Sequence, residues 1–439
     1  MSARAPQIET ADVVDATADG RGIARTDGKT VFVHGAIAGE RVRFVRRRKR
    51  RSYDEAELVE VLAPSADRVS PECRAFGICG GCSLQHLAPS AQLELKQRAL
   101  LDSLARIGDV APGEVLPPIS GDAWGYRRKA RLAAKYVAGK GRVLVGFRER
   151  HTSYVADMER CETLHPRVGG ALNQLSQLIG GLSIKERLPQ IEVAVGDNAA
   201  SLVFRLLTLP SAEDLEKFRG FSKSANLQVF LQPAGPRSVE PLRGGGDPAQ
   251  LFYEIPAHAL RIYFEPLDFI QVHREVNLAM IDQAMTLLDI HADSRVLDLF
   301  CGLGNLTLPL ARKAREVVGV EGSAEMISRA ERNASRAGID NASFRHGDLS
   351  EPRVTQELCG EAYDRALLDP PRTGAREVIE ALGRTGAGRI VYISCHPGTL
   401  ARDAAKLVNE MGYDLKAAGV IDMFPQTSHV ESMAVFEKR

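Results

Sequence analysis

The sequence has no long apolar run, and this absence limits what the protein can be. No stretch of about 18 consecutive apolar residues occurs, so no membrane-spanning helix is expected. Met1–Thr10 also lacks the apolar centre of a secretory signal. Together these absences predict a cytoplasmic protein without membrane contact, in which thiols stay reduced and structural disulfides are not expected.

An excess of charge of either sign is missing as well. The 57 Lys and Arg residues nearly balance the 56 Asp and Glu residues, which leaves a net charge of +1. The distribution is more informative than the total, because residues 40–51 hold eight basic side chains and one acidic side chain. This basic run predicts a phosphate-contacting surface, and the alternative is an ordinary solvated face.

The length of 439 residues predicts two or three domains, and three sequence patterns follow one another along the chain. No protein partner is indicated, and we expect a monomer. Short β-rich runs with turns such as Asp19-Gly20 predict a small β-barrel over residues 1–65. Residues 66–265 mix helices, strands and Gly- and Pro-rich turns, which predicts an α+β region. From 266 to 439 strands alternate with helices, which predicts a Rossmann-like α/β domain with a doubly wound, mostly parallel sheet.

A buried strand runs into a glycine turn within Val296–Asn305. Open α/β sheets bind ligands beyond the carboxyl ends of their strands, where Gly302 and Gly304 let the backbone approach a bound molecule. Glu321 ends the next strand, where its carboxylate can accept both ribose hydroxyls of an adenosine, and Asp348 follows the third strand, near the adenine. We therefore predict a cofactor site; the alternative is a glycine turn with incidental acids.

Two further features narrow the cofactor and the chemistry. Thr307 stands where a dinucleotide fingerprint has its third glycine, which favours S-adenosylmethionine over NAD. The fourth strand closes with Asp369-Pro370-Pro371-Arg372, a rigid turn that holds the Asp369 carboxylate toward the reacting centre. Because similar turns occur in adenine-N6 methyltransferases, this turn alone does not choose the substrate.

Cys395 ends the fifth strand, at the same edge of the predicted sheet. Uracil C5 is too weak a nucleophile to take a methyl group directly, whereas a thiolate that adds to C6 delivers electron density to C5. We predict Cys395 as this nucleophile, with a pKa lowered by His396 or Arg372. Glu431, at the start of the last strand, is the candidate base for the C5 proton. The alternatives are an inert thiol and a surface carboxylate.

A glycine-rich loop carries three more cysteines. Cys73, Cys79 and Cys82 are spaced by five and two residues, and Cys161 is the nearest fourth candidate ligand. Four thiolates suit either a zinc ion or a [4Fe–4S] cluster, and unliganded thiols are a further alternative. The chemistry of the ligands alone leaves this choice open.

These motifs, in this order, resemble those of the RNA uracil-5-methyltransferases. The resemblance is carried by residues 269–272, 297–305, 368–372, 393–397 and 429–431. It implies Cys395 as nucleophile and Glu431 as general base. It also implies an S-adenosylmethionine site lined by Gln271, Phe300, Asn305, Glu321, Asp348 and Asp369. The chain departs from the family pattern at His273 and His396, where the family usually has Asn.

The N-terminal region resembles the TRAM domain, a small RNA-binding β-barrel of the OB type, at residues 20–24 and 42–44. Ribosomal-RNA members of the family carry a [4Fe–4S] cluster on cysteines spaced like Cys73, Cys79, Cys82 and Cys161. Barrel, cluster and catalytic domain together resemble members that methylate 23S ribosomal RNA. Residues 126–131 supply a second basic strand headed by an aromatic side chain, suited to gripping folded RNA.

Two rival functions fit part of the pattern. An adenine or guanine amino-methyltransferase would use the Asp369 turn but leave Cys395 and Glu431 without a role. A non-catalytic RNA-binding factor would have no need of intact Gln271, Glu321, Cys395 and Glu431. The residues therefore favour methylation of a uridine at C5, and the resemblance implies 23S ribosomal RNA as the substrate.

Overall fold

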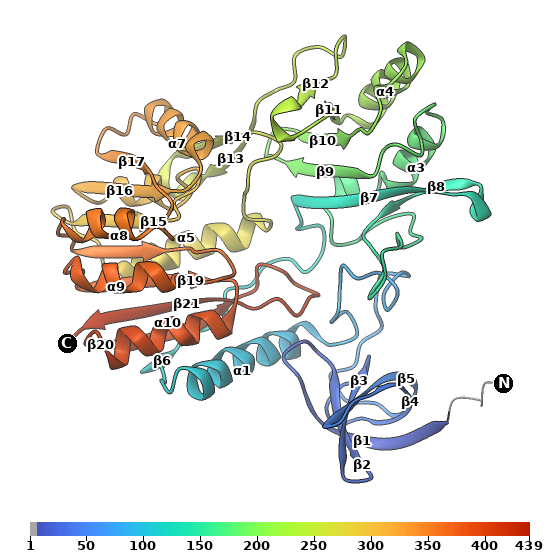
Figure 1. The fold of residues 1–439 in the computed structure, drawn as a ribbon, viewed down its shortest axis with the longest axis horizontal. Coiled ribbons are helices and arrows are strands. Elements are labelled where there is room, and N and C mark those ends of the chain that lie inside the picture. The colour runs from blue at the N-terminus through green and yellow to red at the C-terminus, as the bar shows by residue number, and fades with distance from the viewer. Residues whose placement is uncertain (1–6) are drawn as a thin grey trace.

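The computed structural model describes residues 7–439, apart from the side chains of residues 352, 358 and 359. The first six residues of the predicted segment 1–65 lie outside the described residues. Figure 1 shows a small barrel at the lower right, a central sheet above it and a large sheet covered by helices on the left. Within the described part of the chain, no helix is both long and apolar enough to cross a membrane.

The N-terminal strands form a closed barrel, which confirms the predicted architecture of this region. Its strand order is β1-β2-β3-β5-β4. Apolar side chains at alternate positions of the strands fill the interior, which is why these short runs curl into a barrel. The strands are β1 (Ile8–Ala16), β2 (Gly22–Thr26), β3 (Lys29–His34), β4 (Arg41–Lys49) and β5 (Tyr53–Ala63).

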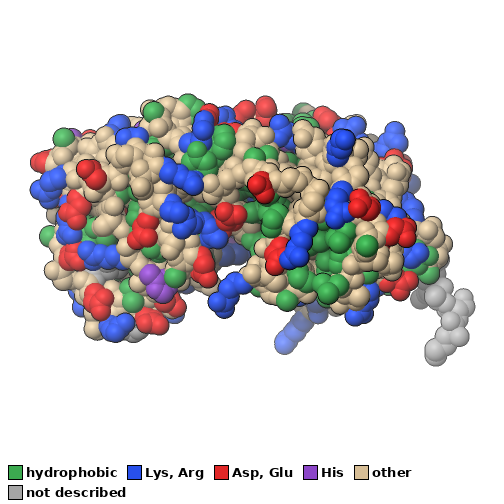
Figure 2. All heavy atoms as spheres, turned by 90° about the horizontal axis from the view of Figure 1, so that it is seen from above, with side chains coloured by type: hydrophobic (Ala, Val, Ile, Leu, Met, Phe, Trp, Pro, Cys, Tyr) green, Lys and Arg blue, Asp and Glu red, His purple; other side chains and the backbone are tan. Residues whose placement is uncertain are grey.

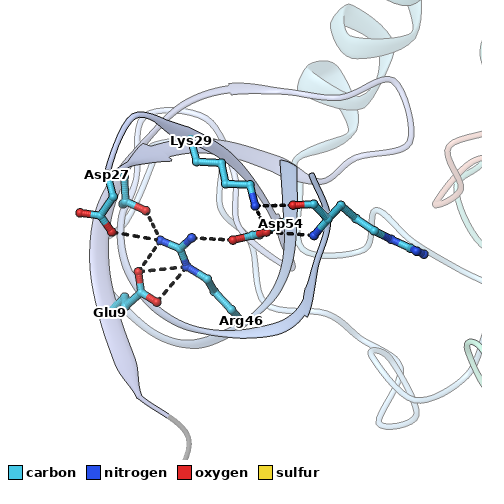
Figure 3. A network of polar contacts seen from close by, with 7 residues as sticks. Glu9, Asp27, Lys29, Arg46 and Asp54 are labelled. Carbon is cyan, nitrogen blue, oxygen red and sulfur yellow. Dashed lines mark hydrogen bonds and ion pairs between the residues drawn. The ribbon is translucent and has the colours of Figure 1, made fainter. Parts of the chain in front are cut away.

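The basic run divides into one internal and several external side chains (Figure 3). Arg46 is only 11% exposed and pairs with Glu9 at 2.7 Å and Asp54 at 2.6 Å. Lys29 also reaches Asp54, and its hydrogen bond is the main cause that lowers the pKa of Asp54 to about 2. Arg46 therefore ties the barrel together. Arg41, Arg43 and residues 47–51 are exposed; Arg41 and Arg43 are paired with Asp12 and Glu60, and residues 47–51 form the continuous exposed stretch for contact with phosphate.

The central region contains a sheet of order β12-β11-β10-β9-β7-β8. Its strands are β7 (Lys129–Val137), β8 (Arg142–Gly146), β9 (Gln190–Val195), β10 (Ala200–Arg205), β11 (Gln228–Gln232) and β12 (Glu240–Pro241). As the predicted α+β character requires, the region also contains helices: α3 (Leu172–Gly180), preceded by the short α2 (Pro166–Gly169). A further helix, α4 (Ala212–Ala225), was not predicted; it begins with a capping box formed by Ser211 and Asp214.

The large sheet has the order β17-β16-β15-β18-β19-β21-β20-β6. Neighbours from β17 to β19 run parallel, and β21 is antiparallel to both β19 and β20, so the predicted mostly parallel sheet is confirmed. The strands are β6 (Glu114–Val115), β15 (Arg295–Leu299), β16 (Glu316–Glu321), β17 (Ala342–His346), β18 (Arg365–Leu368), β19 (Arg389–Ser394), β20 (Tyr413–Ile421) and β21 (Glu431–Lys438).

Helices cover both faces of this sheet. On one face pack α5 (Arg274–Leu288), α6 (Thr307–Ala311) and α7 (Ala324–Arg336), and their buried side chains share a core with β15 and β16. On the other face lie α1 (Pro89–Ile107), α9 (Arg376–Arg384) and α10 (Pro397–Asn409). The sequence analysis did not predict α8 (Pro352–Cys359), which connects β17 to β18.

Two segments that precede residue 266 also pack onto the large sheet. The hairpin β13 (Leu251–Ile255) and β14 (Leu260–Phe264) contributes side chains to the same core as α5. The segment 113–119, which contains β6, donates backbone hydrogen bonds to the outer edge of β20. The domain ranges 1–65, 66–265 and 266–439 stay a prediction, because packing crosses the last of these boundaries.

Candidate active site

The chain turns sharply after β15, as the glycine pattern predicts. Gly302 and Gly304 have φ angles of 56° and 87°, and Phe300 has φ 66°, which is rarely adopted by a residue with a side chain. Glu321, at the end of β16, accepts hydrogen bonds from the amides of Gly302 at 3.2 Å and Ser323 at 3.0 Å. Its carboxylate thus borders the turn, at the carboxyl edge of the sheet.

A small cavity of about 50 Å³ lies against this turn. Four of the six predicted cofactor residues line it, namely Gln271, Phe300, Asn305 and Asp369. Glu321 reaches its edge through the amide of Gly302. Asp348 is not among the lining residues; its exposed carboxylate accepts hydrogen bonds from the amide and hydroxyl of Ser350. The structure therefore brings five of the predicted side chains together and leaves Asp348 outside the cavity.

The amide of Asn305 is held by residues that the sequence analysis did not single out. Its Oδ1 accepts from the hydroxyl of Tyr253 at 2.9 Å and from Nδ2 of Asn277 at 3.1 Å, and its Nδ2 donates to Oδ1 of Asn277 at 2.9 Å. These partners come from the β13–β14 hairpin and from α5. Nothing in the local sequence of the hairpin indicates such a contact.

Asp298 is a further cavity residue that the sequence analysis missed. It lies on β15, is 1% exposed and accepts a hydrogen bond from the hydroxyl of Thr307 at 2.5 Å. Burial raises the pKa of Asp298 to about 7, and its Oδ1 has no hydrogen-bond partner within residues 7–439. Its position directly before the glycine turn was the signal that could have revealed it.

Cys395 stands at the end of β19, half-buried beside two acidic side chains. Burial is the main cause that raises the pKa of the Cys395 thiol, and the carboxyl groups of Glu431 and Asp369 add to this effect. Arg372 acts in the opposite direction but does not dominate. The prediction of a lowered pKa is therefore wrong, because burial and the two carboxyl groups outweigh the guanidinium.

Glu431 begins β21, as predicted, and β21 lies between β19 and β20 and is antiparallel to both, so its start lies beside the end of β19. The side chain is 8% exposed, and burial, followed by repulsion from Asp369, raises its pKa to about 8. Its Oε2 accepts no hydrogen bond from any described residue. At neutral pH this carboxyl group is therefore largely protonated in the free protein.

Asp369 connects the cavity to the reacting residues. Its Oδ2 accepts a hydrogen bond from Nε2 of Gln271 at 3.3 Å, and burial raises its pKa to about 7. The same carboxyl group raises the pKa values of Cys395 and Glu431. The carboxyl end of β18 thus lies between the cavity on one side and, on the other, the carboxyl end of β19 and the start of β21.

The two histidines that depart from the family pattern share one structural role. Nδ1 of His396 accepts a hydrogen bond from the amide of Thr399 at 3.2 Å and caps α10. Nδ1 of His273 accepts a longer one, 3.5 Å, from the amide of Val276 and caps α5. Asn is a preferred residue at such N-cap positions because its side-chain oxygen accepts the same kind of bond. His396 therefore caps a helix beside the nucleophile.

Comparison with known proteins places this geometry in a family. A family described as tRNA (Uracil-5-)-methyltransferase matches residues 257–439. The 23S rRNA (uracil(1939)-C(5))-methyltransferase RlmD of Alkalilimnicola ehrlichii is 53% identical, over 96% of this chain and 94% of the relative. RlmD of Methylococcus capsulatus is 51% identical, over 96% and 95% of the two chains. The chain belongs to the RNA uracil-5-methyltransferase family.

A solved structure shares the fold of this uracil-5-methyltransferase. It is the tRNA (uracil-54, C5)-methyltransferase of Pyrococcus abyssi, crystallised in complex with S-adenosyl-L-homocysteine. The TM-score is 0.74 at 22% identity, and the match covers 97% of this chain and 99% of the other. At this identity the likeness concerns the fold, and it extends over nearly the whole molecule.

The four predicted metal-ligating cysteines of the methyltransferase lie near one another. Cys73, Cys79 and Cys82 interact electrostatically with Cys161, and none of the four is in a disulfide. Burial raises the pKa of Cys79 to about 11 and that of Cys82 to about 12. Among the described residues, however, no group of three or more His, Cys, Asp or Glu side chains has the spacing to hold a metal ion.

The second basic strand of the methyltransferase, residues 127–131, is largely engaged within the protein. The guanidinium of Arg127 lies over the rings of Phe147 and Phe424, and Arg128 pairs with Asp197 at 2.5 Å. Figure 2 shows Lys and Arg side chains interspersed with Asp and Glu on the face seen from above, in keeping with the small net charge. Contact of this strand with RNA stays a prediction.

Proposed function

We propose that this protein transfers a methyl group from S-adenosylmethionine to C5 of a specific uridine in 23S ribosomal RNA in the cytoplasm. The observation that carries the proposal is the meeting of Cys395, Asp369 and Glu431 at the carboxyl edge of the large sheet. A thiol and a buried carboxyl group beside a cavity at the glycine turn are what C5 methylation of uracil requires. The names of the relatives supply the RNA.

The cavity residues fit the cofactor chemically. Gln271 offers an amide, Phe300 an aromatic side chain and Glu321 a carboxylate for ribose hydroxyls. The unpartnered Oδ1 of Asp298 is a buried acceptor with room beside it in the described structure, which suits a cationic or N–H group. When bound, S-adenosylmethionine supplies an electrophilic methyl group.

Cys395 performs the first covalent step of the proposed mechanism. Its sulfur forms a bond to C6 of the uracil, and the C5–C6 π electrons move to give an enolate with density on C5. The thiol first loses its proton to solvent, which burial and the neighbouring carboxyl groups disfavour. Protonation of Asp369 and Glu431, whose raised pKa values are about 7 and about 8, reduces this repulsion near neutral pH.

Glu431 performs the last step. After C5 has been methylated, the carboxylate of Glu431 takes the remaining C5 proton, and the electron pair of that C–H bond restores the C5–C6 double bond. The C6–S bond breaks and its electron pair returns to the sulfur of Cys395. A buried carboxylate is suited to this work because a raised pKa makes it a stronger base.

We further propose that Cys73, Cys79, Cys82 and Cys161 hold a [4Fe–4S] cluster. The support is their mutual proximity, their reduced state and the resemblance to cluster-bearing members of the family. Four soft sulfur ligands from two chain segments suit such a cluster. The methylation needs no electron transfer, so the cluster would tie residues 73–82 to residue 161.

We propose that the barrel within residues 1–65 binds the RNA. In this division of the chain, residues 66–265 form the cluster-bearing region and residues 266–439 form the catalytic domain. The exposed basic side chains of residues 47–51 are suited to phosphates. Base-modifying enzymes act on a base flipped out of its stack, so contacts remote from the cavity help to hold the RNA.

A covalent trap tests the proposed activity. RNA with 5-fluorouridine at the target is expected to form a stable adduct with the wild-type protein in the presence of S-adenosylmethionine, because fluorine is not removed as a proton. Denaturing gels measure the adduct. Cys395→Ala should abolish it, whereas Glu410→Ala, which changes an exposed carboxylate at the end of α10, should retain it. No wild-type adduct, or an undiminished one in Cys395→Ala, contradicts the proposal.

Visible absorbance tests the cluster. An anaerobic preparation is expected to be brown and to contain about four iron and four sulfide ions per chain. Cys79→Ala should lose the colour. A colourless wild-type protein that contains one zinc ion per chain would contradict the cluster and support a zinc site.

A further inference from the structure

Lys96 is a buried ammonium group that the proposed mechanism does not use. It lies on α1 and is 1% exposed; its Nζ donates to Oδ1 of Asp422 at 2.5 Å and to the carbonyl of Phe424 at 3.1 Å. Lysine is almost never fully buried unless it is paired. Because desolvation offsets the attraction, a buried pair contributes little net stability, which leaves its presence here in need of another explanation.

The pair lies beside the proposed general base. Asp422 directly follows Ile421, the last residue of β20, and Ile421 is the cross-strand partner of Glu431 on β21. Figure 1 shows α1 running along the large sheet below β20 and β21. Both members of the pair act on Glu431: Lys96 favours its carboxylate form and Asp422 disfavours it.

The charged surroundings of Glu431 come from four elements. Asp369 at the end of β18 and Asp422 after β20 favour the protonated form of Glu431. The charge of Glu431 in turn disfavours the thiolate form of Cys395, at the end of β19. Lys96 of α1 is the cation that acts on it most among the described groups. Two other basic groups lie in this region: His429, two residues before Glu431 on the loop into β21, is acted on by Lys96 and Arg372, and Arg372, after β18, acts on Cys395. Removing Lys96 would take away the main cation that favours the carboxylate form of Glu431.

We propose that Lys96 and Asp422 are positioning residues for the base step, and that together they set how readily Glu431 accepts the C5 proton. Lys96 stabilises the carboxylate that must take the proton. Asp422 holds the ammonium in place and limits its effect, so that Glu431 stays basic. This inference rests on the proposed function, since it assigns a role toward the base of that reaction.

Opposite single substitutions test the inference. Lys96→Met removes the cation, so the pH at which turnover reaches half its maximum should rise by about one unit. Asp422→Asn removes an anion and frees Lys96 to act on Glu431, so this midpoint should fall. The double variant should return toward the wild-type value. Turnover is measured from pH 6 to 10 as methyl transfer to a 23S ribosomal RNA transcript.

Adduct formation separates the base step from the nucleophile. With 5-fluorouridine RNA the proton-removal step is blocked, so the rate of adduct formation reports Cys395 and should change less than twofold in Lys96→Met. Arg98→Met is the matched control, because Arg98 lies on the same helix in an exposed pair with Asp15 at 3.0 Å. It should leave the pH profile unchanged.

The outcomes are distinguishable. Absence of any wild-type adduct overturns the proposed function. The role of the pair is overturned if the adduct forms normally and the pH midpoint of turnover is the same in Lys96→Met, Asp422→Asn and the wild type. It is also overturned if the midpoint shifts in the same direction in both variants. If Lys96→Met does not fold, as shown by its thermal unfolding, the isosteric Asp422→Asn decides: a midpoint that does not fall overturns the inference.

Discussion

Carboxyl groups kept neutral by burial distinguish this site at the scale of single residues. Asp298, Asp369 and Glu431 have pKa values raised to about 7, 7 and 8, and burial is the main cause at each. Each therefore titrates in the range in which the enzyme works, and small changes in the surroundings alter the charge of the site.

The raised pKa of Glu431 predicts a pH-dependent stability. The folded protein keeps this proton up to about pH 8, whereas the unfolded chain loses it near pH 4.5, the ordinary pKa of a glutamate side chain. The contribution of Glu431 to stability therefore falls as pH rises between these values. Glu431→Gln mimics the protonated group. Its unfolding temperature should exceed that of the wild type by about 3 °C or more at pH 9 and equal it near pH 4.5.

Thermal unfolding followed by circular dichroism checks this prediction. Glu410→Gln, which changes an exposed carboxylate at the end of α10, serves as control and should leave the pH dependence unaltered. The same offset at pH 4.5 and pH 9 for Glu431→Gln would contradict the titration.

Site residues within or next to a sequence motif were predictable from the sequence. Site residues that reach the site from distant parts of the chain were not. Cys395 and Glu431 follow from their positions at strand ends, and the five cavity-side residues from the glycine turn and the resemblance. Lys96 and Asn277 reach the site from distant helices, so no local pattern announces them. The predicted direction of the Cys395 pKa shift was also wrong, because the burial of the thiol and its distances to nearby charges depend on tertiary packing.

At the scale of elements, α1 joins segments that are far apart in the chain. Gln92 exchanges two hydrogen bonds of 3.0 Å with Gln426, whose φ of 67° is unfavourable for a residue with a side chain. The amide of Ser428 donates to the hydroxyl of Ser83 at 2.9 Å, beside Cys82. The loop 422–430, which leads into β21, is therefore held by the helix and the cysteine loop.

Gln92→Ala should loosen this loop. The substitution removes both hydrogen bonds to Gln426 and leaves the backbone amide of Gln426 buried without this partner. This loss should lower the free energy of unfolding by about 1–3 kcal/mol. Amide hydrogen exchange in a peptide covering residues 422–430 should accelerate at least tenfold.

Glu94→Ala is the control on the exposed face of the same helix and should leave exchange in this peptide unchanged. Equal protection in Gln92→Ala and the wild type would show that the helix does not hold the loop.

Most elements of the large sheet were predictable from alternating strands and helices, whereas α4 was not. Its sequence contains Gly220 and buries only Asp214, Phe218 and Phe221, so its apolar stripe is short. The capping box at Ser211 was the available signal. The place of the β13–β14 hairpin on the catalytic core arises from tertiary packing, which a local pattern does not contain.

At the scale of the whole molecule, RNA binding should draw on charge remote from the cavity. Arg47→Ala combined with Arg51→Ala removes two exposed charges from the barrel side. The slope of log Kd against log salt for a 23S ribosomal RNA transcript should fall by about 1.5, because two phosphate contacts no longer release counterions. Filter binding at several salt concentrations measures this slope.

The matched control is Lys313→Ala with Arg315→Ala, two exposed charges just before β16, at the amino edge of the catalytic sheet. The slope should stay at the wild-type value in this variant. An equal decrease in both double variants would show that the barrel has no special share in RNA binding.

The segment 113–119 covers the outer edge of β20, and this has a consequence for the tendency of the protein to aggregate. β20 is nine residues long, and an uncovered edge of that length offers its amides and carbonyls to strands of other molecules. Gly113, Leu116 and Ile119 occupy this edge through backbone hydrogen bonds to residues 415–420. A segment that precedes the catalytic sheet by well over a hundred residues thus protects it from aggregation, and cleavage of the chain near residue 119 would be expected to cost the enzyme its solubility before its fold.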